Sequence, residues 1–190
     1  MLTSALGPAE QVPFLDAGYR VCQTLRLLEM GLTPTMEAPH PGPGLRIRPA
    51  RRKDMRSILK LDAAAFDAFW RFDAEALVEA AYATPRNRRR VAQRGGRIVG
   101  YIMTGRSGRT GFVQRLAVDP DHHGRGTGRI LLVDSLSWLQ RGGATRALVN
   151  TQPGNYQALA LYRNTGFTQR PEGLAVLRFD RDKSLGGEQL

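Results

Sequence analysis

Cysteine is almost absent from this chain: Cys22 stands alone among 190 residues. No disulfide can form within the chain, which fits a reducing compartment, so we expect a cytoplasmic protein. No apolar run approaches the roughly 20 residues that cross a bilayer, which argues against a membrane partner. The opening stretch MLTSALGPAEQVPF also lacks the basic start and the long apolar core of a secretory signal.

Negative charge is scarce as well, with 17 Asp and Glu against 28 Lys and Arg and a formal net charge of +11. A basic surface favours anionic partners: the phosphates of a coenzyme, an acidic substrate or nucleic acid. Excess charge alone does not single out nucleic acid, so we do not expect it as a partner and keep a nucleic-acid-binding module only as an alternative. Hydrophobic residues make up 42% of the chain, which is enough for a packed core.

Proline and glycine divide the chain into four parts. Residues 1–33 form an N-terminal extension with a mixed apolar segment, and residues 34–44 are a linker rich in both residue types. Residues 45–180 carry the alternating strand and helix patterns of a folded domain. Residues 181–190 form a tail that we expect to be flexible.

The apolar periodicity of residues 45–180 predicts three or four strands followed by alternating strands and helices. Gly95-Gly96 predicts the turn of a hairpin, and Asp54 and Asp73 are placed to cap helices. Strands are expected at 45–49, 88–93, 98–105, 110–118, 147–151, near 167 and at 175–179, and helices from 54 and at 73–81, 128–140 and 156–164. This order predicts an α/β (α+β) fold, a mixed sheet with helices on both faces.

A glycine-rich loop joins one predicted strand to a helix within LAVDPDHHGRGTGRILL, residues 116–132. Gly124, Gly126 and Gly128 let the backbone approach an anion, whose oxygens the free N–H groups and the helix dipole then bind. A P-loop is excluded because the loop has no lysine, and a dinucleotide fingerprint is excluded because Arg129 occupies its last glycine position. Taken alone, the loop also fits a turn that merely starts a helix.

A second motif, N-x-x-A-x-x-L-Y-x-x-x-G-F, spans residues 155–167, about thirty residues after the loop. On a helix Ala158, Leu161 and Tyr162 share one face, so the motif alone is an amphipathic helix that ends at Gly166. The combination is more specific, and the two segments resemble motifs A and B of the Gcn5-related N-acetyltransferase (GNAT) family. His123 stands where that family's pattern has glutamine or arginine.

The resemblance implies a mostly antiparallel mixed sheet that splays between its two central parallel strands, and acetyl-CoA as cosubstrate, with no metal. It further implies that Tyr162 protonates the leaving thiolate and that main-chain groups of one strand pair with the pantetheine arm. The coenzyme-binding residues implied are Leu116, Ala117, Val118, His123, Gly124, Arg125, Gly126, Thr127, Gly128, Arg129 and Asn155.

The general base is not evident, because no Asp or Glu lies between Glu79 and Asp119 or between Asp134 and Glu172. Asn150 occupies the position of a glutamate in some N-terminal acetyltransferases of the family and is a candidate to position a water. The base is then a water chain, or an acid of the first helical pair (Asp67, Asp73 or Glu75), or there is none. An α-amine with a pKa of about 8 needs less help than a lysine near 10.4, which favours a weakly basic amine.

The acceptor is expected along AAFDAFWRFDAEAL, residues 64–77, although core packing also explains its aromatic residues. The function predicted is direct acetyl transfer to a peptide N-terminus or a small-molecule amine; the alternatives are a CoA-binding regulatory module without catalysis and the nucleic-acid module. The arginine run at 86–90 is either a solvated strand face or a dock for acidic substrates, and a homodimer is left open. The acceptor candidates are Phe66, Asp67, Phe69, Trp70, Tyr101 and Gln114.

The extension repeats a pattern of the main domain. FLDAGYRVCQTLRLLEM (14–30) and YRNTGFTQRPEGLAVLRF (162–179) both have a helix end, then glycine and an aromatic residue, then strand-like residues. One hypothesis is that the extension is the remnant of a second GNAT half, which supplies strands to a sheet edge or to a partner subunit. The other is a leader with chance similarity. A short strand pair is not stable alone, so the first hypothesis requires burial of its apolar side.

Overall fold

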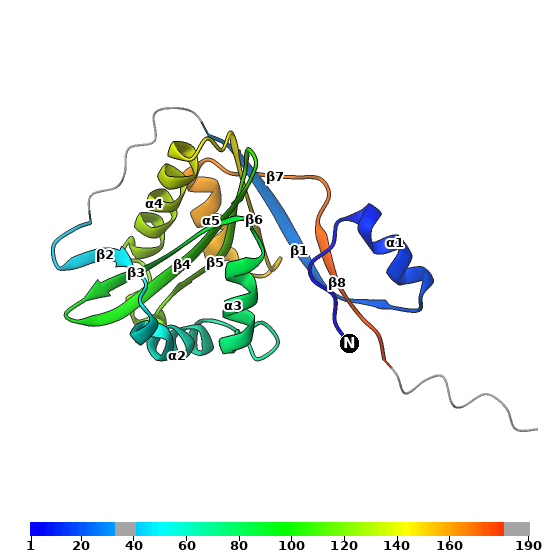
Figure 1. Ribbon diagram of the computed structural model, residues 1–190, viewed down its shortest axis with the longest axis horizontal. Helices are drawn as coiled ribbons and strands as arrows, with labels where there is room; N and C mark the ends of the chain where they lie inside the picture. The colour runs from blue at the N-terminus through cyan, green and yellow to red at the C-terminus, as the bar shows by residue number, and fades with distance from the viewer. Residues whose placement is uncertain (33–40, 181–190) are drawn as a thin grey trace, which may run out of the picture.

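The computed structural model describes residues 1–32 and 41–180, so the predicted tail and most of the predicted linker lie outside the described residues. One eight-stranded sheet runs through the molecule in the order β2-β3-β4-β5-β6-β1-β7, and β8 pairs with β1 (Figure 1). The strands are β1 (Arg20–Gly31), β2 (Leu45–Pro49), β3 (Arg86–Arg94), β4 (Arg97–Ser107), β5 (Thr110–Val118), β6 (Arg146–Thr151), β7 (Thr168–Gln169) and β8 (Leu174–Arg178). Among the pairings of these strands, β5–β6 is parallel and the rest are antiparallel, which confirms the predicted mixed sheet.

Helices cover both faces of the sheet, as predicted. On one face Leu132 and Leu136 pack with Ile102 and Val113; on the other Ile58 and Leu77 pack with Tyr101 and Met103. No helix of the described residues is long and apolar enough to cross a bilayer. The first face carries α4 (Thr127–Arg141) and α5 (Tyr156–Thr165), the second α2 (Met55–Ala65) and α3 (Ala74–Tyr82); α1 is Pro8–Asp16, and short 3-10 turns span Arg52–Asp54 and Pro120–His122.

Local signals explain where several elements begin and end. The glycines 95 and 96 have φ of 53° and 79°, the conformation that a two-residue hairpin turn needs. Asp73 caps α3 by accepting the N–H of Ala76. Asp54 precedes α2 but does not cap it, contrary to the prediction: its carboxylate instead accepts the N–H of Arg51 and pairs with Arg48 at 2.6 Å.

The two parallel strands separate after a short ladder. β5 pairs with β6 only from Thr110 to Val113, while β5 continues to Val118. A register shift against β4 leaves Gln114 as an extra residue, a β-bulge. Val113 before it belongs to the α4/α5 core, and Ala117 after it belongs to the α2/α3 core. The bulge thus reverses which face of the sheet the side chains occupy, at the point where β5 leaves β6. The separation of these two strands is the predicted splay.

The N-terminal extension lies inside the sheet rather than at its edge. Residues 26–31 of β1 pair with β6, and Leu28 and Glu29 also pair with β7. Leu28 is fully buried in the core beneath α4 and α5. Residues 20–25 continue outward and pair with β8, so β1 connects the main sheet to the end of the molecule that carries α1 (Figure 1).

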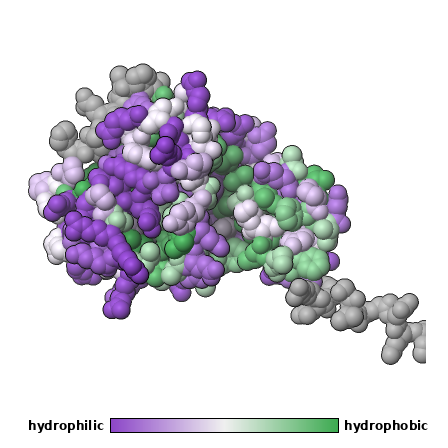
Figure 2. Space-filling model, viewed as in Figure 1, coloured by the Kyte–Doolittle hydropathy of each residue, from purple (hydrophilic) through white to green (hydrophobic). Residues whose placement is uncertain are grey.

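The repeat seen in the sequence is also a repeat in structure. α1 is followed by Gly18 in the left-handed conformation and then by Tyr19 and β1; α5 is followed by Gly166 in the same conformation, Phe167 and β7. β8 lies between β1 and residues 2–6, much as β1 lies between β7 and β6. Figure 2 shows apolar side chains gathered at this end, where Leu2, Val12 and Val21 are exposed. The origin of the extension in a second half stays a prediction.

Removal of residues 1–33 should leave the protein insoluble or lower its Tm by many degrees, because β6 would lose its partner β1 along Arg146–Thr151 and would keep only the short pairing with β5. Unchanged solubility, Tm and activity in the truncated protein would show that the extension is dispensable.

A point variant tests the same contact without deletion. Leu28→Ala should lower the free energy of unfolding by about 2–5 kcal/mol because it opens a cavity in the core. Thr24→Ala, at an exposed position of the same strand, should change it by less than about 1 kcal/mol. Equal losses in urea titrations of the two variants would contradict the placement of β1.

Candidate functional site

A cavity of about 490 Å³ lies where β5 separates from β6. One wall is the end of β5, which pairs with β4 but no longer with β6; the second is the loop that leads into α4, and the third is α5. Ala65 and Phe66 close it from the end of α2. We call it the β5–β6 cavity. The lining residues that the sequence predicted are Phe66, Leu116, Ala117, Val118, His123, Gly124, Gly126, Thr127, Gly128, Arg129, Asn155 and Tyr162; those it did not assign are Ala65, His122, Gln157, Ala158 and Leu161.

The glycine loop, residues 123–129, has the backbone of an anion site. Gly124 and Gly126 have φ of 72° and 76°, which side chains other than glycine's rarely adopt, and no atom lies within 4 Å of a Cβ built at either position. α4 begins at Thr127, so the first-turn N–H groups have no acceptor inside the helix. Thr127 is buried, and its hydroxyl has no hydrogen-bond partner among the described residues. An unpaired buried hydroxyl beside free amides fits the oxygen of an anionic ligand such as a pyrophosphate.

His123 takes part in the loop through its ring. Nε2 lies 2.9 Å from the main-chain oxygen of Val118. A carbonyl oxygen only accepts, so the ring carries its proton on Nε2. The same oxygen has a second lone pair, so this contact leaves it able to accept from a ligand.

Two predicted residues belong to α5 and its cap. The side-chain oxygen of Asn155 accepts the N–H of Ala158 at 3.1 Å and caps the helix, and the residue also lines the cavity. Tyr162 is buried, with its ring 5.8 Å from that of Phe167. Burial raises the pKa of Tyr162 well above its ordinary value near 10, and the charge of Arg115 partly opposes this. The phenol is therefore protonated throughout the neutral range.

An acid that sequence reasoning missed lies next to this site. Asp62 of α2 is fully buried, and both its oxygens accept from Arg115 of β5 at 2.8 Å. It also accepts from the hydroxyl of Tyr101 and from the N–H of Phe72. We call this the Asp62–Arg115 pair. The two residues are 53 positions apart in the chain, so no local sequence pattern predicts that they form a pair.

Arg115 also organises the aromatic segment, residues 66–72. Its Nη2 donates to the main-chain oxygen of Trp70 at 2.7 Å. Its guanidinium lies 3.5 Å from the ring centre of Phe66 and 3.9 Å from that of Phe72, within the range of cation–π contact. Phe66 thus contacts this cation and also lines the β5–β6 cavity.

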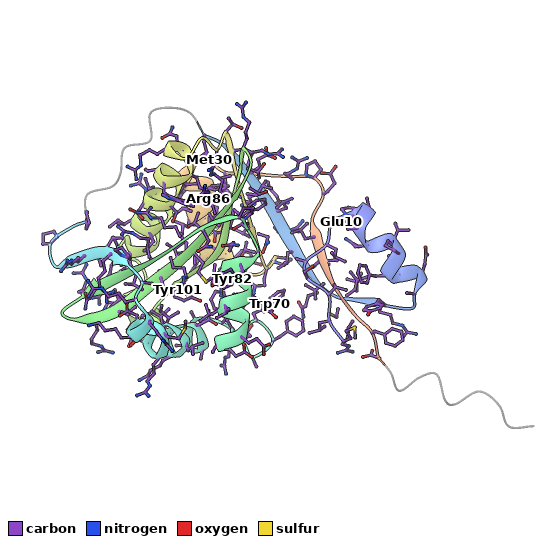
Figure 3. All side chains as sticks on the ribbon, viewed as in Figure 1. Glu10, Met30, Trp70, Tyr82, Arg86 and Tyr101 are labelled. Carbon is purple, nitrogen blue, oxygen red and sulfur yellow. The ribbon has the colours of Figure 1, made fainter. Side chains whose placement is uncertain are left out.

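The structure separates the other acceptor candidates from the cavity. Tyr101 is buried beneath α2 and Asp67 is exposed; Trp70 is half-buried on the α2–α3 connection (Figure 3). Phe69 packs edge-on against Trp70 at 5.0 Å, outside the cavity lining.

Three further predicted positions also lie outside the lining. Gln114 donates to the main-chain oxygen of Ala80 at 2.8 Å and so ties α3 to the sheet. Asn150 is exposed on β6 opposite Leu27, and Arg125 does not line the cavity.

The arginine run at 86–90 does not form one surface. Arg88 and Arg90 pair with Asp134 of α4 at 3.1 and 3.2 Å, whereas Arg86 and Arg89 are exposed. Alternation along β3 sends neighbouring side chains to opposite faces. Within residues 1–32 and 41–180, no three His, Cys, Asp or Glu side chains could together hold a metal ion.

A splayed mixed sheet with a glycine loop at the start of a helix, opposite a buried tyrosine, is the arrangement of an acetyltransferase of the type that the sequence resembles. Residues 55–167 match the model of the acetyltransferase (GNAT) family, which is more than half of the chain. The chain belongs to the GNAT family.

Relatives and solved structures agree with this membership. Over 89 residues the chain is 44% identical to the N-alpha-acetyltransferase RimI of Mycobacterium tuberculosis, covering 45% of this chain and 54% of that protein. Over 180 residues it is 28% identical to a mycothiol acetyltransferase of Pseudarthrobacter chlorophenolicus, covering 86% and 55%. The chain thus spans about half the length of these relatives. A tandem GNAT protein from the clavulanic acid biosynthesis pathway shares the fold, with a TM-score of 0.66, 14% identity, and coverage of 91% of this chain and 62% of that one.

Gly126→Val should weaken coenzyme A binding at least tenfold, about 1.4 kcal/mol, because a β-branched residue disfavours the left-handed backbone that presents the loop amides. Gly96→Val is the matched control: its φ of 79° and its open surroundings resemble those of Gly126, but it lies in the β3–β4 turn. Calorimetry on the two folded variants measures the affinity. Equal affinities would contradict the role of the loop.

Proposed function

We propose that the chain transfers the acetyl group of acetyl-CoA directly to an amine, either a peptide N-terminus or a small-molecule amine. The observation that carries the proposal is the β5–β6 cavity, which has the glycine loop on one wall and the protonated Tyr162 on another. The names of two relatives, an N-alpha-acetyltransferase and a mycothiol acetyltransferase, support the two classes of acceptor. A cytoplasmic location remains a prediction from the lone cysteine.

Each wall of the cavity has a part in this proposal. The amides from Gly124 to Arg129, with the hydroxyl of Thr127, bind the pyrophosphate. The end of β5, Leu116 to Val118, offers main-chain groups that β6 does not use, and these pair with the pantetheine amides. The side-chain amide of Asn155 adds a donor from α5. Arg125 and Arg129 add positive charge at the rim.

Tyr162 is the general acid in this proposal. The amine nitrogen attacks the thioester carbon, the carbon–sulfur bond breaks, and the thiolate takes the phenolic proton. A thiol has a pKa of about 8.5, below the raised pKa of Tyr162, so the proton is shared with the sulfur through a hydrogen bond as the thiolate leaves and returns to the phenolate afterwards. A main-chain N–H near Val118 stabilises the carbonyl oxygen as charge develops on it.

The proton lost by the amine goes to water. Asp62 is not the base, because its two oxygens already accept four hydrogen bonds. Asp73 is occupied as the cap of α3, and Asp67 is exposed. Asn150 has no basic lone pair, and its proposed role is to orient a water on the β6 side of the splay. An amine that is partly neutral at the working pH needs no stronger base.

Tyr162→Phe should lower kcat for acetyl transfer by about 10²–10⁴-fold, the range of general acid catalysis, with little change in coenzyme affinity. The proton matters when the thiolate leaves, so the loss belongs to the chemical step. Single-turnover kinetics with release of the coenzyme thiol measures it. An unchanged chemical step would remove Tyr162 from the mechanism.

The pH profile tests the same proton. The folded pKa of Tyr162 is raised, so the acid form persists as pH rises, while the acceptor amine becomes neutral. The wild-type rate should therefore rise with pH and then level off, without a fall before about pH 10. A descending limb centred at or below about pH 10 would show that the acid titrates in its ordinary range or lower, against the burial of Tyr162.

A further inference from the structure

The β5–β6 cavity contains no counter-charge for a cation where the acceptor amine must reach the thioester. None of the described residues that line it is Asp or Glu; Arg129, at the rim of the glycine loop, belongs in the proposed function to the phosphates of the coenzyme. Acceptor amines differ sharply in charge: a peptide N-terminus carries one amine beside a neutral carbonyl, and a polyamine carries several ammonium groups. A site for polycations normally places carboxylates against them.

The nearest buried carboxylate cannot serve this purpose. Asp62 is fully buried and saturated by two bonds from Arg115, one from the Tyr101 hydroxyl and one from the N–H of Phe72. The guanidinium of Arg115 contacts both this carboxylate and the ring of Phe66, which is a residue of the cavity lining. The positive member of the pair is therefore the one in contact with the lining ring. The charge of Arg115 also acts on Tyr162 of the cavity lining, because it lowers the pKa of Tyr162 against the larger rise that burial causes.

Phe66 is also unsuited to a cationic acceptor. A phenyl ring attracts a cation through the negative face of its quadrupole. One face of this ring already holds Arg115 at 3.5 Å. A second ammonium on the other face would meet a partly neutralised ring with a like charge behind it. An apolar group on that face meets no such penalty.

We propose that Arg115, held by Asp62 behind the Phe66 ring, is a specificity-determining residue that selects amines attached to a neutral group and rejects polycationic amines. The inference rests on the proposed acetyl transfer and narrows its acceptor. Arg115 acts through Phe66 and through the potential at the cavity wall, so it is a positioning residue and not a catalytic one. Repulsion of the wrong acceptor is the physical basis of the selection.

The test compares two acceptors, a short peptide with a free N-terminus and no basic side chain, and spermidine. Thiol release gives kcat/KM for each. The wild-type protein should favour the peptide at least tenfold, about 1.4 kcal/mol. The double variant Asp62→Asn, Arg115→Gln removes both charges, which avoids leaving one of them buried without a partner. Its preference should fall about tenfold, mainly through a lower KM for spermidine, with coenzyme affinity unchanged.

Two controls separate charge from shape. Arg115→Lys keeps the positive charge and should keep the preference even if it loses stability. Arg89→Gln removes an exposed charge of β3 outside the β5–β6 cavity and should leave the preference unchanged. An unaltered preference in the folded double variant would overturn the inference.

If the double variant does not fold, the comparison of the two acceptors with the wild-type protein still tests the inference. A kcat/KM for spermidine equal to or above that for the peptide overturns the inference and leaves acetyl transfer standing. Absence of thiol release with every amine overturns the proposed function, and the inference with it.

Discussion

The end of the β5–β6 ladder at Val113 and Val149 is the constraint on which the site depends. A continuous ladder would bury the main-chain groups of residues 114–118 in the sheet and close the cavity. The β-bulge at Gln114 lies where the ladder ends and reverses which face of the sheet the following side chains occupy. Arg115 and Ala117 therefore face α2, while Leu116 packs toward α4. The unpaired groups need other partners, since buried backbone polar groups without hydrogen bonds are costly. Solvent or an amide-bearing ligand in the cavity can supply them.

Because the β5–β6 ladder ends early, the end of β6 depends on the N-terminal extension for its strand pairing. Beyond Val149, β6 has no β5 partner, and Asn150 and Thr151 pair with β1 alone among the described strands. One wall of the splay is therefore held by residues more than a hundred positions away in the chain. β1 does not line the cavity, yet the position of β6 depends on it. A strand inside the sheet has structural contacts that its place at the start of the sequence does not suggest.

Most of the fold and of the glycine loop could be predicted from short stretches of the sequence. The Gly95-Gly96 turn, the cap at Asp73, the end of α5 at Gly166 and the loop before α4 each depend on a few neighbouring residues, and each lies where it was predicted. The predicted cap at Asp54 was wrong because the N–H of Arg51 and the guanidinium of Arg48 occupy its carboxylate. The pairing of β1 with β6 and β8 joins segments that no periodicity links.

The surroundings of the predicted acceptor residues were the hardest part to predict, because they also depend on contacts between segments that are distant in the chain. On the sequence alone, the aromatic residues of segment 66–72 form one group of acceptor candidates. In the structure, their positions differ according to how each contacts Arg115 of β5. Phe66 and Phe72 lie against the guanidinium, Trp70 contributes its carbonyl, and Phe69 stays at the surface. Only a three-dimensional contact distinguishes them.

A buried ion pair is weak evidence for stability, because the cost of desolvating two charges often equals or exceeds their attraction. The Asp62–Arg115 pair offsets that cost with further hydrogen bonds from Tyr101 and Phe72 and with two aromatic faces. Apolar side chains of the same volume would fill the space at no electrostatic cost. They would not, however, hold the Trp70 carbonyl, fix the Phe66 ring or set a positive charge behind it. The pair is thus better explained by what it does to the cavity wall than by what it adds to the free energy of folding. The same hydrogen bonds that anchor the aromatic segment also leave Asp62 no free lone pair to take a proton, which is why the proposed mechanism gives the amine proton to water.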